Sequence, residues 1–186
     1  MSAQLAIDTS TSRTTVALIV DGKVTWSDFE DGAIAHAEAV PRLVQKALAI
    51  ENNIEQIIVG MGPGPYTGLR AGISFAQAFA WARKIEVRGV CSLDAIMCTA
   101  PEYVAATDAR RKEIYWAAYK DGRRIDGPHV NLPAEVEAKV FVGEGAHKYG
   151  LSDVATYPDL SRFAQLSPVD QPMYLRRPDA VPTSER

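Results

Sequence analysis

The chain carries one short pattern twice, in two places a hundred residues apart. An apolar run ends at Asp8, and Asp21-Gly22 follows thirteen residues later. A second apolar run ends at Asp108, and Asp121-Gly122 follows at the same interval. β-branched and aromatic residues lead into each Asp-Gly pair, which is typical of a two-residue hairpin turn. The repeat therefore predicts two copies of one supersecondary unit, each built on an antiparallel meander.

The elements expected after each meander follow the same order. In the first half we expect strands at 5–7, 14–20 and 23–29, a helix that opens near 36 and ends at 48, a strand at 57–59, a helix at 67–83, a strand at 87–90 and a further helix capped by Ser92. In the second half we expect strands at 103–108, 114–119 and 127–131, a short helix at 133–139, a strand at 140–143 and a helix at 161–166. The prediction is an α/β fold with a complete N-terminal lobe at residues 1–100 and a shortened C-terminal lobe with an extended tail at residues 101–186.

Length and charge narrow the class of protein. With 186 residues, 47% of them hydrophobic, the chain can bury a core. Its net charge of −3, with no basic stripe, argues against a protein that binds nucleic acid alone. We find no signal segment and no apolar run long enough to span a bilayer, so we expect a cytoplasmic protein without membrane contact. Cys91 and Cys98 are too few for a disulfide framework and do not have a zinc-site spacing.

The helix expected at 67–83 has two apolar stripes. One stripe contains Leu69, Ile73, Ala76 and Ala80, and the other contains Ala71, Phe75, Ala78, Phe79 and Ala82. Two stripes predict that one covers the sheet and the other meets a partner protein. The two phenylalanines favour their own stripe as the core. The expected partner surface therefore lies on both long helices, at Val40, Leu43, Ala47, Leu69, Ile73, Ala76, Gln77 and Ala80.

A glycine-rich loop, Gly62-Pro63-Gly64-Pro65-Tyr66-Thr67-Gly68, leads into this helix. It lacks the lysine of a phosphate-binding P-loop and the glycine spacing of a dinucleotide site. A helix N-terminus still suits an anion, but a sharp corner with Thr67 as the helix cap is the favoured interpretation. We expect the loop to position the interface helix through Gly62, Gly64, Thr67, Gly68 and Arg70.

Asp8-Thr9-Ser10, at the end of the first strand, is a candidate for a residual nucleotide or phosphate turn. Hydroxyl and backbone N–H groups can bind an anion there, and the aspartate can hold a metal. A polar turn closed by the aspartate side chain is the favoured alternative. The charged turn at 108–113 could contact a phosphate backbone or an acidic partner, or simply be solvated. No set of residues assembles a nucleophile, a base and an oxyanion site.

Several segments together resemble the TsaB (YeaZ) family: LAIDTSTSRTTVALIVDG, HAEAVPRLV, GMGPGPYTGLRAGISFAQAFA, VRGVCSLDAI, DARRKEIYWAAY and QPMYLRR. The resemblance implies two RNase H-like lobes of the actin, Hsp70 and sugar-kinase type, with the second lobe reduced. It also implies a non-catalytic dimerization subunit that pairs with the catalytic paralogue TsaD and cooperates with the ATPase TsaE. That complex transfers threonylcarbamoyl to the adenosine next to the anticodon of tRNAs reading codons that begin with A.

The resemblance further implies where cofactors bind. The catalytic paralogue holds its metal through H-x-x-x-H on the first long helix, where this chain has His36 and then Val40. An alkyl side chain cannot ligate a metal, so we expect a pseudo-enzyme with no metal and no cofactor of its own. ATP or ADP and the metal would bind the partner subunits, and tRNA would bind only through the complex. A homodimer in isolation, a glycoprotease-like metallopeptidase and a small-molecule kinase of the same fold stay open as alternatives.

Overall fold

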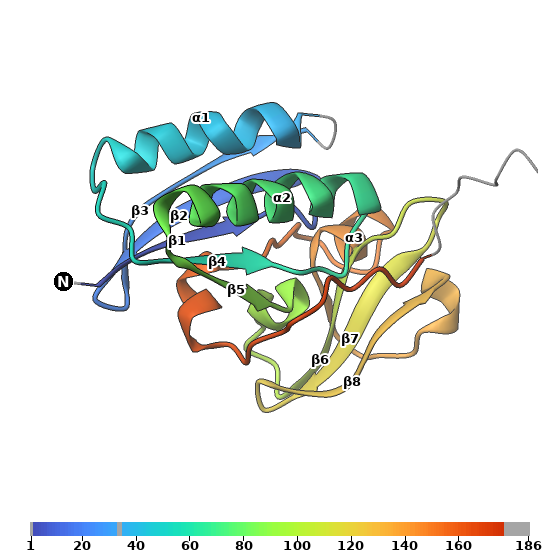
Figure 1. The fold of residues 1–186 in the computed structure, drawn as a ribbon. Coiled ribbons are helices and arrows are strands. Elements are labelled where there is room, and N and C mark those ends of the chain that lie inside the picture. Colours follow the sequence, from blue (N-terminus) through green and yellow to red (C-terminus); the bar gives the residue numbers. More distant parts are fainter. Residues whose placement is uncertain (1, 33–34, 177–186) are drawn as a thin grey trace, which may run out of the picture.

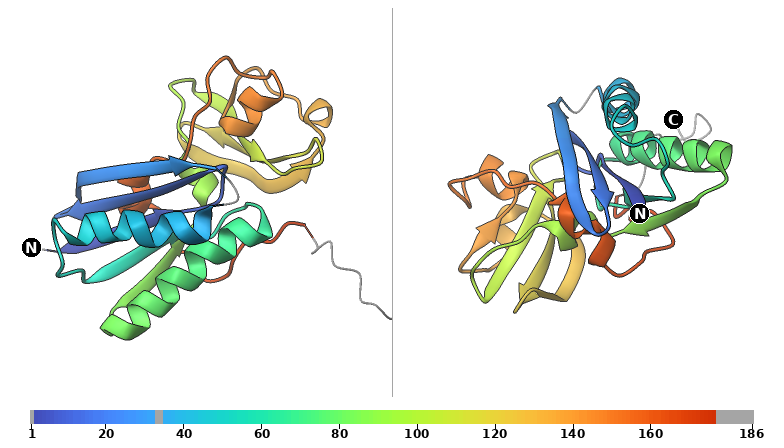
Figure 2. Two further views of the ribbon diagram at one scale, coloured as in Figure 1. Left: turned by 90° about the horizontal axis from the view of Figure 1, so that it is seen from above. Right: turned by 90° about the vertical axis from the view of Figure 1, so that its left-hand side faces the viewer.

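The computed structural model describes residues 2–32 and 35–176, which form two lobes lying side by side (Figures 1 and 2). The sheet of the first lobe contains β1 (Ala3–Asp8), β2 (Arg13–Val20), β3 (Lys23–Asp31), β4 (Gln56–Gly60) and β5 (Glu86–Val90). Its strand order is β3-β2-β1-β4-β5. The β1–β3 meander is antiparallel, whereas β4 and β5 are parallel to β1.

The sheet of the second lobe repeats this order. It contains β6 (Glu102–Asp108), β7 (Ile114–Lys120), β8 (Arg123–Asn131) and β9 (Phe141–Val142), arranged β8-β7-β6-β9. Asp8 and Asp108 each end the first strand of their own sheet. The two hairpin turns also agree, with φ of 49° at Asp21 and at Asp121 and a left-handed glycine next in each. The predicted duplication and the two-lobed α/β fold are therefore confirmed.

Two long helices cover one face of the first sheet (Figure 1). They are α1 (His36–Leu48) and α2 (Tyr66–Arg83). The apolar positions of each helix recur every three or four residues, so they fall on one side and pack against the strands. Within the described residues, no helix is both long and apolar enough to cross a membrane.

The partner surface expected from the sequence must be corrected. Seven of its eight residues lie in the core of this chain, with exposed fractions of 0–5%: Val40, Leu43, Ala47, Leu69, Ile73, Ala76 and Ala80. Gln77 alone of the eight is exposed. The stripe of small and aliphatic residues lies flat on the sheet because small side chains let the helix approach it closely. The Phe75 and Phe79 stripe, expected in the core, is only half-buried.

The second lobe is smaller because its helices are short. A 3-10 turn, η2 (Pro133–Glu135), replaces the helix expected at 133–139. After β9 the chain forms α3 (Glu144–Lys148), which the sequence did not predict. Five residues that begin after the left-handed Gly143 are too few to reveal a helical period. Between the lobes, η1 (Ser92–Ala95) is a single 3-10 turn without a side-chain cap, so the predicted capping role of Ser92 is wrong.

The C-terminal segment returns to the first lobe rather than completing the second. Its 3-10 helix, η3 (Leu160–Gln165), is capped by Asp159, whose carboxylate accepts the Ser161 N–H at 2.9 Å. Leu160 and Phe163 pack against Ala6, Ala17, Ile19 and Ile58, on the face of the first sheet opposite α1 and α2. Residues 168–176, which we call the strap, then follow the edge of that sheet: the Val169 N–H donates to the Gly89 carbonyl at 2.9 Å. Part of the segment predicted for the C-terminal lobe thus lies against the N-terminal lobe.

Candidate functional site

The candidate phosphate turn is buried and closed on itself. Asp8 is only 1% exposed. One carboxylate oxygen accepts the Ser10 N–H at 3.0 Å and the Ser10 hydroxyl at 2.8 Å, and the other accepts the Ser92 hydroxyl at 2.6 Å. Burial raises the pKa of Asp8, although the hydrogen bonds from Ser92 and Ser10 act in the opposite direction. The bond from the Ser10 N–H confirms the alternative of a polar turn closed by the aspartate side chain.

The glycine-rich loop and the start of α2 pack directly on this turn. A Cβ at Gly64 would lie 2.5 Å from the Ser10 carbonyl oxygen, and one at Gly72 would lie 2.4 Å from the Thr9 hydroxyl. The Thr9 hydroxyl itself donates to the Gly68 carbonyl at 2.8 Å. The glycines are therefore required because two backbone segments meet here. The chain's own loop fills the space over the Asp8–Ser10 turn, and these groups do not fit a bound phosphate.

The start of α2 differs from the prediction in one respect. The helix begins at Tyr66, with Pro65 in the N-cap position and no side-chain capping bond, so the capping role predicted for Thr67 is wrong. A proline before the first turn already has the φ that a helix requires. Arg70 is exposed and donates to the Tyr66 hydroxyl at 2.9 Å, one turn away on the same helix face.

His36 and Val40 are both turned away from solvent. His36 is 4% exposed, and its Nδ1 lies 2.7 Å from the Thr14 hydroxyl. Burial lowers the pKa of His36, which favours the neutral imidazole. Val40 lies one turn on, in the core. Across residues 2–32 and 35–176 no group of three or more His, Cys, Asp or Glu side chains could hold a metal ion. The residues at this position do not fit the metal of the catalytic paralogue.

The equivalent position in the second lobe carries a charged cluster that sequence analysis missed. Asp108 accepts the Lys148 ammonium at 2.6 Å and the Tyr149 hydroxyl at 2.9 Å. Burial alone would raise the pKa of Asp108, but these two hydrogen bonds bring it below its ordinary value. Glu144 links the lobes, because it accepts the Asp108 N–H at 3.1 Å and the Ser12 hydroxyl at 3.4 Å. No local spacing connects residues about 40 positions apart, so no sequence signal identifies this cluster.

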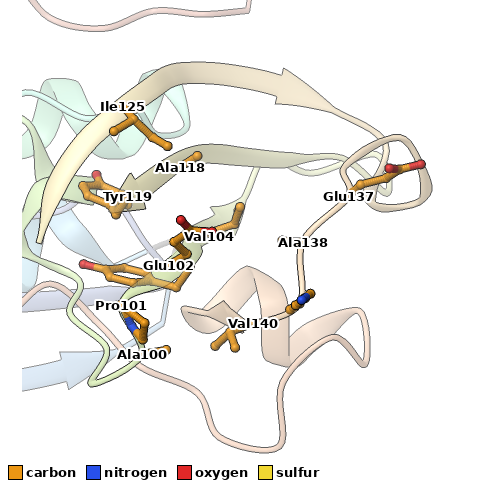
Figure 3. Close-up of a pocket in the computed structure, with 12 residues that line it drawn as sticks. Ala100, Pro101, Glu102, Val104, Ala118, Tyr119, Ile125, Glu137, Ala138 and Val140 are labelled. Carbon is orange, nitrogen blue, oxygen red and sulfur yellow. The ribbon is translucent and has the colours of Figure 1, made fainter. Parts of the chain in front are cut away.

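A cavity of about 560 Å³ lies on the second sheet (Figure 3). Strands β6 and β7 and residues 137–140 line it, with Val104, Ala118 and Val140 among the apolar walls. It occupies the face that α1 covers in the first lobe, where the second lobe has only the short turn η2. The cavity reaches Glu102, at the start of β6, and is therefore separated from Asp108 by the length of that strand.

Comparison with known proteins is consistent with this architecture. The family model described as TsaD, tRNA N6-adenosine threonylcarbamoyltransferase, matches residues 30–149. An uncharacterized protein of Mycobacterium leprae is 40% identical over an alignment of 208 positions, gaps included. The alignment covers 98% of this chain and 57% of that protein. The Escherichia coli tRNA threonylcarbamoyladenosine biosynthesis protein TsaB is 36% identical over 126 residues, which cover 62% of this chain and 54% of TsaB. The chain thus spans little more than half of either relative.

A solved structure covers more of the fold. The crystal structure of a Pseudomonas aeruginosa protein, described as similar to the peptidase YEAZ, superposes with a TM-score of 0.78 at 27% identity. The match covers 95% of this chain and 100% of that one. Since the family model spans more than half of the chain, and the named relatives are TsaB and YeaZ, the chain belongs to the TsaB (YeaZ) family.

Proposed function

We propose that this chain acts in tRNA threonylcarbamoyladenosine biosynthesis as a non-catalytic subunit that pairs with a TsaD-type catalytic relative. The E. coli relative is a tRNA threonylcarbamoyladenosine biosynthesis protein, which supports the assignment to this pathway. The main support for a non-catalytic role is that Gly64 and Gly72, from the chain's own loop and helix, occupy the space beside the Asp8–Ser10 turn. A position that would receive a phosphate in an active two-lobed enzyme instead holds the first lobe together.

The geometry supports a partner surface on the solvent side of α2. Trp81 is 85% exposed, and Tyr66, at the other end of the helix, is 42% exposed. Gln77 lies between them on the same face of the helix. Exposed aromatic side chains of this size are typical of protein interfaces. This surface replaces the buried stripe that the sequence suggested.

If this chain is a scaffold subunit, its partners must bind the nucleotide and the metal. The nucleotide and the metal would bind the TsaD-type and TsaE-type subunits, and tRNA would be modified only by the assembled complex. In isolation the same α2 face would favour a homodimer, because an apolar surface without its partner tends to pair with its own copy. The cytoplasmic location expected from the sequence belongs to this proposal.

The test is co-purification with a TsaD-type relative that retains H-x-x-x-H. We expect Trp81→Glu to fold normally but to lose the relative, because the charge would be buried without a partner in the complex. Val154→Glu is the matched control, since Val154 is also an exposed apolar residue, at 64%, but lies far along the chain from α2. Normal recovery of the relative with Trp81→Glu would contradict the proposed surface. Failure of the unchanged chain to recover it would contradict the proposed function.

A further inference from the structure

The turn that joins β6 to β7 has an unusual backbone. Arg110, Arg111 and Lys112 have φ of 63°, 50° and 67°, so three consecutive residues other than glycine lie in the left-handed region. This conformation is sterically unfavourable for each L-residue that adopts it. Such a run persists only when its surroundings impose it.

Five contacts impose this conformation. The Ala109 N–H donates to the Glu113 carbonyl at 3.0 Å, and the Glu113 N–H donates to the Arg110 carbonyl at 2.9 Å. The Arg110 N–H donates to the Asp108 carboxylate at 3.0 Å. From the strap, Arg176 donates to the Ala109 carbonyl at 2.9 Å and also pairs with the Glu113 carboxylate. The turn is therefore held at both ends rather than loose.

The side chains of this rigid turn are cationic and exposed. The Arg110 side chain is 51% exposed, and Lys112 is exposed as well. Lys148, 47% exposed, lies beside them on Asp108. On a chain with a net charge of −3, five cations gather here around three carboxylates: Arg110, Arg111, Lys112, Lys148 and Arg176 around Asp108, Glu113 and Glu144. The local charge is thus opposite in sign to that of the whole molecule.

The turn also lies at the junction of the lobes. Glu144 joins the Asp108 N–H of the second lobe to Ser12 of the first, and the positive charge of Arg110 acts on His36 at the start of α1. In Figure 1 the turn and the end of the strap stand on the same side of the molecule as the start of α2. A macromolecule bound across both lobes on this side would therefore meet the cations.

We propose that the basic turn at 110–112, with Lys148, contacts the phosphate backbone of the RNA substrate. This inference rests on the proposed function for the choice of RNA as the anion. Guanidinium groups match phosphate oxygens in shape as well as charge, and cations held in place lose little freedom on binding. Contacts to phosphate position an RNA without reading its sequence, so the turn would orient the substrate for the catalytic partner.

The experiment measures binding of an unmodified tRNA transcript to the isolated chain between about 50 and 200 mM salt. We expect weak binding by the unchanged chain that falls steeply with salt. Arg110→Gln/Lys112→Gln should weaken binding about tenfold and reduce the slope of log affinity against log salt by about 2, because each cation removed cancels roughly one phosphate contact. Glutamine keeps the straight side chain, so the left-handed turn should survive, and thermal melts check this.

The matched control is Lys23→Gln/Arg123→Gln, which removes the same charge at the hairpins directly after Gly22 and Gly122. We expect it to leave both affinity and slope unchanged. The proposal is overturned if the unchanged chain does not bind, if both double variants weaken binding equally, or if Arg110→Gln/Lys112→Gln binds normally. Loss of the TsaD-type relative with RNA binding intact would mean that the turn docks a protein, which also overturns it. Since subunit pairing is tested separately through Trp81, either proposal can fail alone.

Discussion

Asp8 and Asp108 occupy equivalent places in the two sheets, yet their surroundings differ. Asp8 accepts hydroxyl and backbone donors, whereas Asp108 accepts the Lys148 ammonium. Burial raises the pKa of the first, and for the second the bonds from Lys148 and Tyr149 outweigh burial and lower it. The aspartate that ends the first strand is thus held by hydroxyl and backbone donors in one lobe and by an ammonium in the other.

The two aspartates should give opposite pH dependences of stability. Because the folded-state pKa of Asp8 is raised, its contribution is largest below the ordinary value of 3.8 and is lost as pH rises through the raised pKa. The contribution of Asp108 is present above 3.8 and is lost as pH falls through the lowered pKa. Each pKa unit corresponds to about 1.4 kcal/mol.

Urea unfolding of the unchanged chain, Asp8→Asn and Asp108→Asn across acid and neutral pH checks this prediction. The free-energy loss caused by Asp8→Asn should shrink as pH rises, and the loss caused by Asp108→Asn should grow. The assignment is wrong if both losses change in the same direction.

Gly60 is the most crowded glycine of the site. A Cβ there would lie 2.0 Å from the Asp8 carboxylate and 2.5 Å from the Ser92 hydroxyl. We expect Gly60→Ala to lower the free energy of unfolding by about 1–3 kcal/mol, because overpacking forces the neighbouring groups apart. Gly22→Asn is the control: Gly22 has φ of +76° with open space around it, and asparagine tolerates that conformation. Urea midpoints measure both, and equal midpoints would contradict the crowding.

At the scale of the element, α2 is a helix with one core face and one solvent face. Ile73 is 5% exposed and Trp81 is 85% exposed, two turns apart on the same helix. Ile73→Glu should therefore destabilise the chain by about 3–5 kcal/mol, because the new carboxylate is buried without a partner. Trp81→Glu should melt like the unchanged chain. Thermal melts compare the two, and a normal melt for Ile73→Glu would refute the assignment of the faces.

The strap is the second element with a testable role. Arg176 donates to both the Ala109 carbonyl and the Glu113 carboxylate, and a lysine ammonium cannot match this planar pair of donors. We expect Arg176→Lys to speed amide hydrogen exchange at Glu113 about tenfold, equivalent to about 1.4 kcal/mol. Exchange in β4 is the internal control and should not change. Unchanged exchange at Glu113 would show that the other contacts suffice to hold the turn.

At the scale of the whole molecule, the two lobes repeat one topology with different completeness. The first has five strands covered on both faces, by α1 and α2 on one side and η3 on the other. The second has four strands and helices of at most five residues. The strap connects them by following β5 and ending on the turn after β6. The strap therefore ties the second lobe to the more completely covered first lobe.

The proposed pseudo-enzyme role predicts the behaviour of the purified chain. Alone, it should not hydrolyse ATP, cleave peptides or modify tRNA, because Asp8 is occupied by Ser10 and Thr9 by Gly68 of α2. Adding a TsaD-type relative, a TsaE-type ATPase and threonylcarbamoyl-adenylate should give modified tRNA only when the chain is present. Turnover by the chain alone that disappears in His36→Ala would instead favour the peptidase or kinase alternative.

The sequence by itself determined the repeat, because hairpin chemistry and alternating apolar residues act over a few positions. Asp21-Gly22 and Asp121-Gly122 specify their turns wherever they stand, since both residues adopt the left-handed conformation that the turn requires. The strands and the two long helices follow from local periodicity in the same way. The family resemblance added the two-lobed fold, which is confirmed by the order of the four strands that the two sheets share.

Only the tertiary structure decided which surfaces are inside. Periodicity identifies two stripes on α2 but gives no information about the element opposite each one. The sequence alone therefore predicts a partner surface at the stripe of Leu69, Ile73, Ala76 and Ala80, which the structure buries in the core. Asp8 and Ser92 are 84 positions apart, and Asp108 and Lys148 are 40 apart; such pairs are set by how the lobes and the returning C-terminal segment pack. Burial and the pKa values that follow from it depend on all surrounding atoms at once, and no local pattern of residues encodes them.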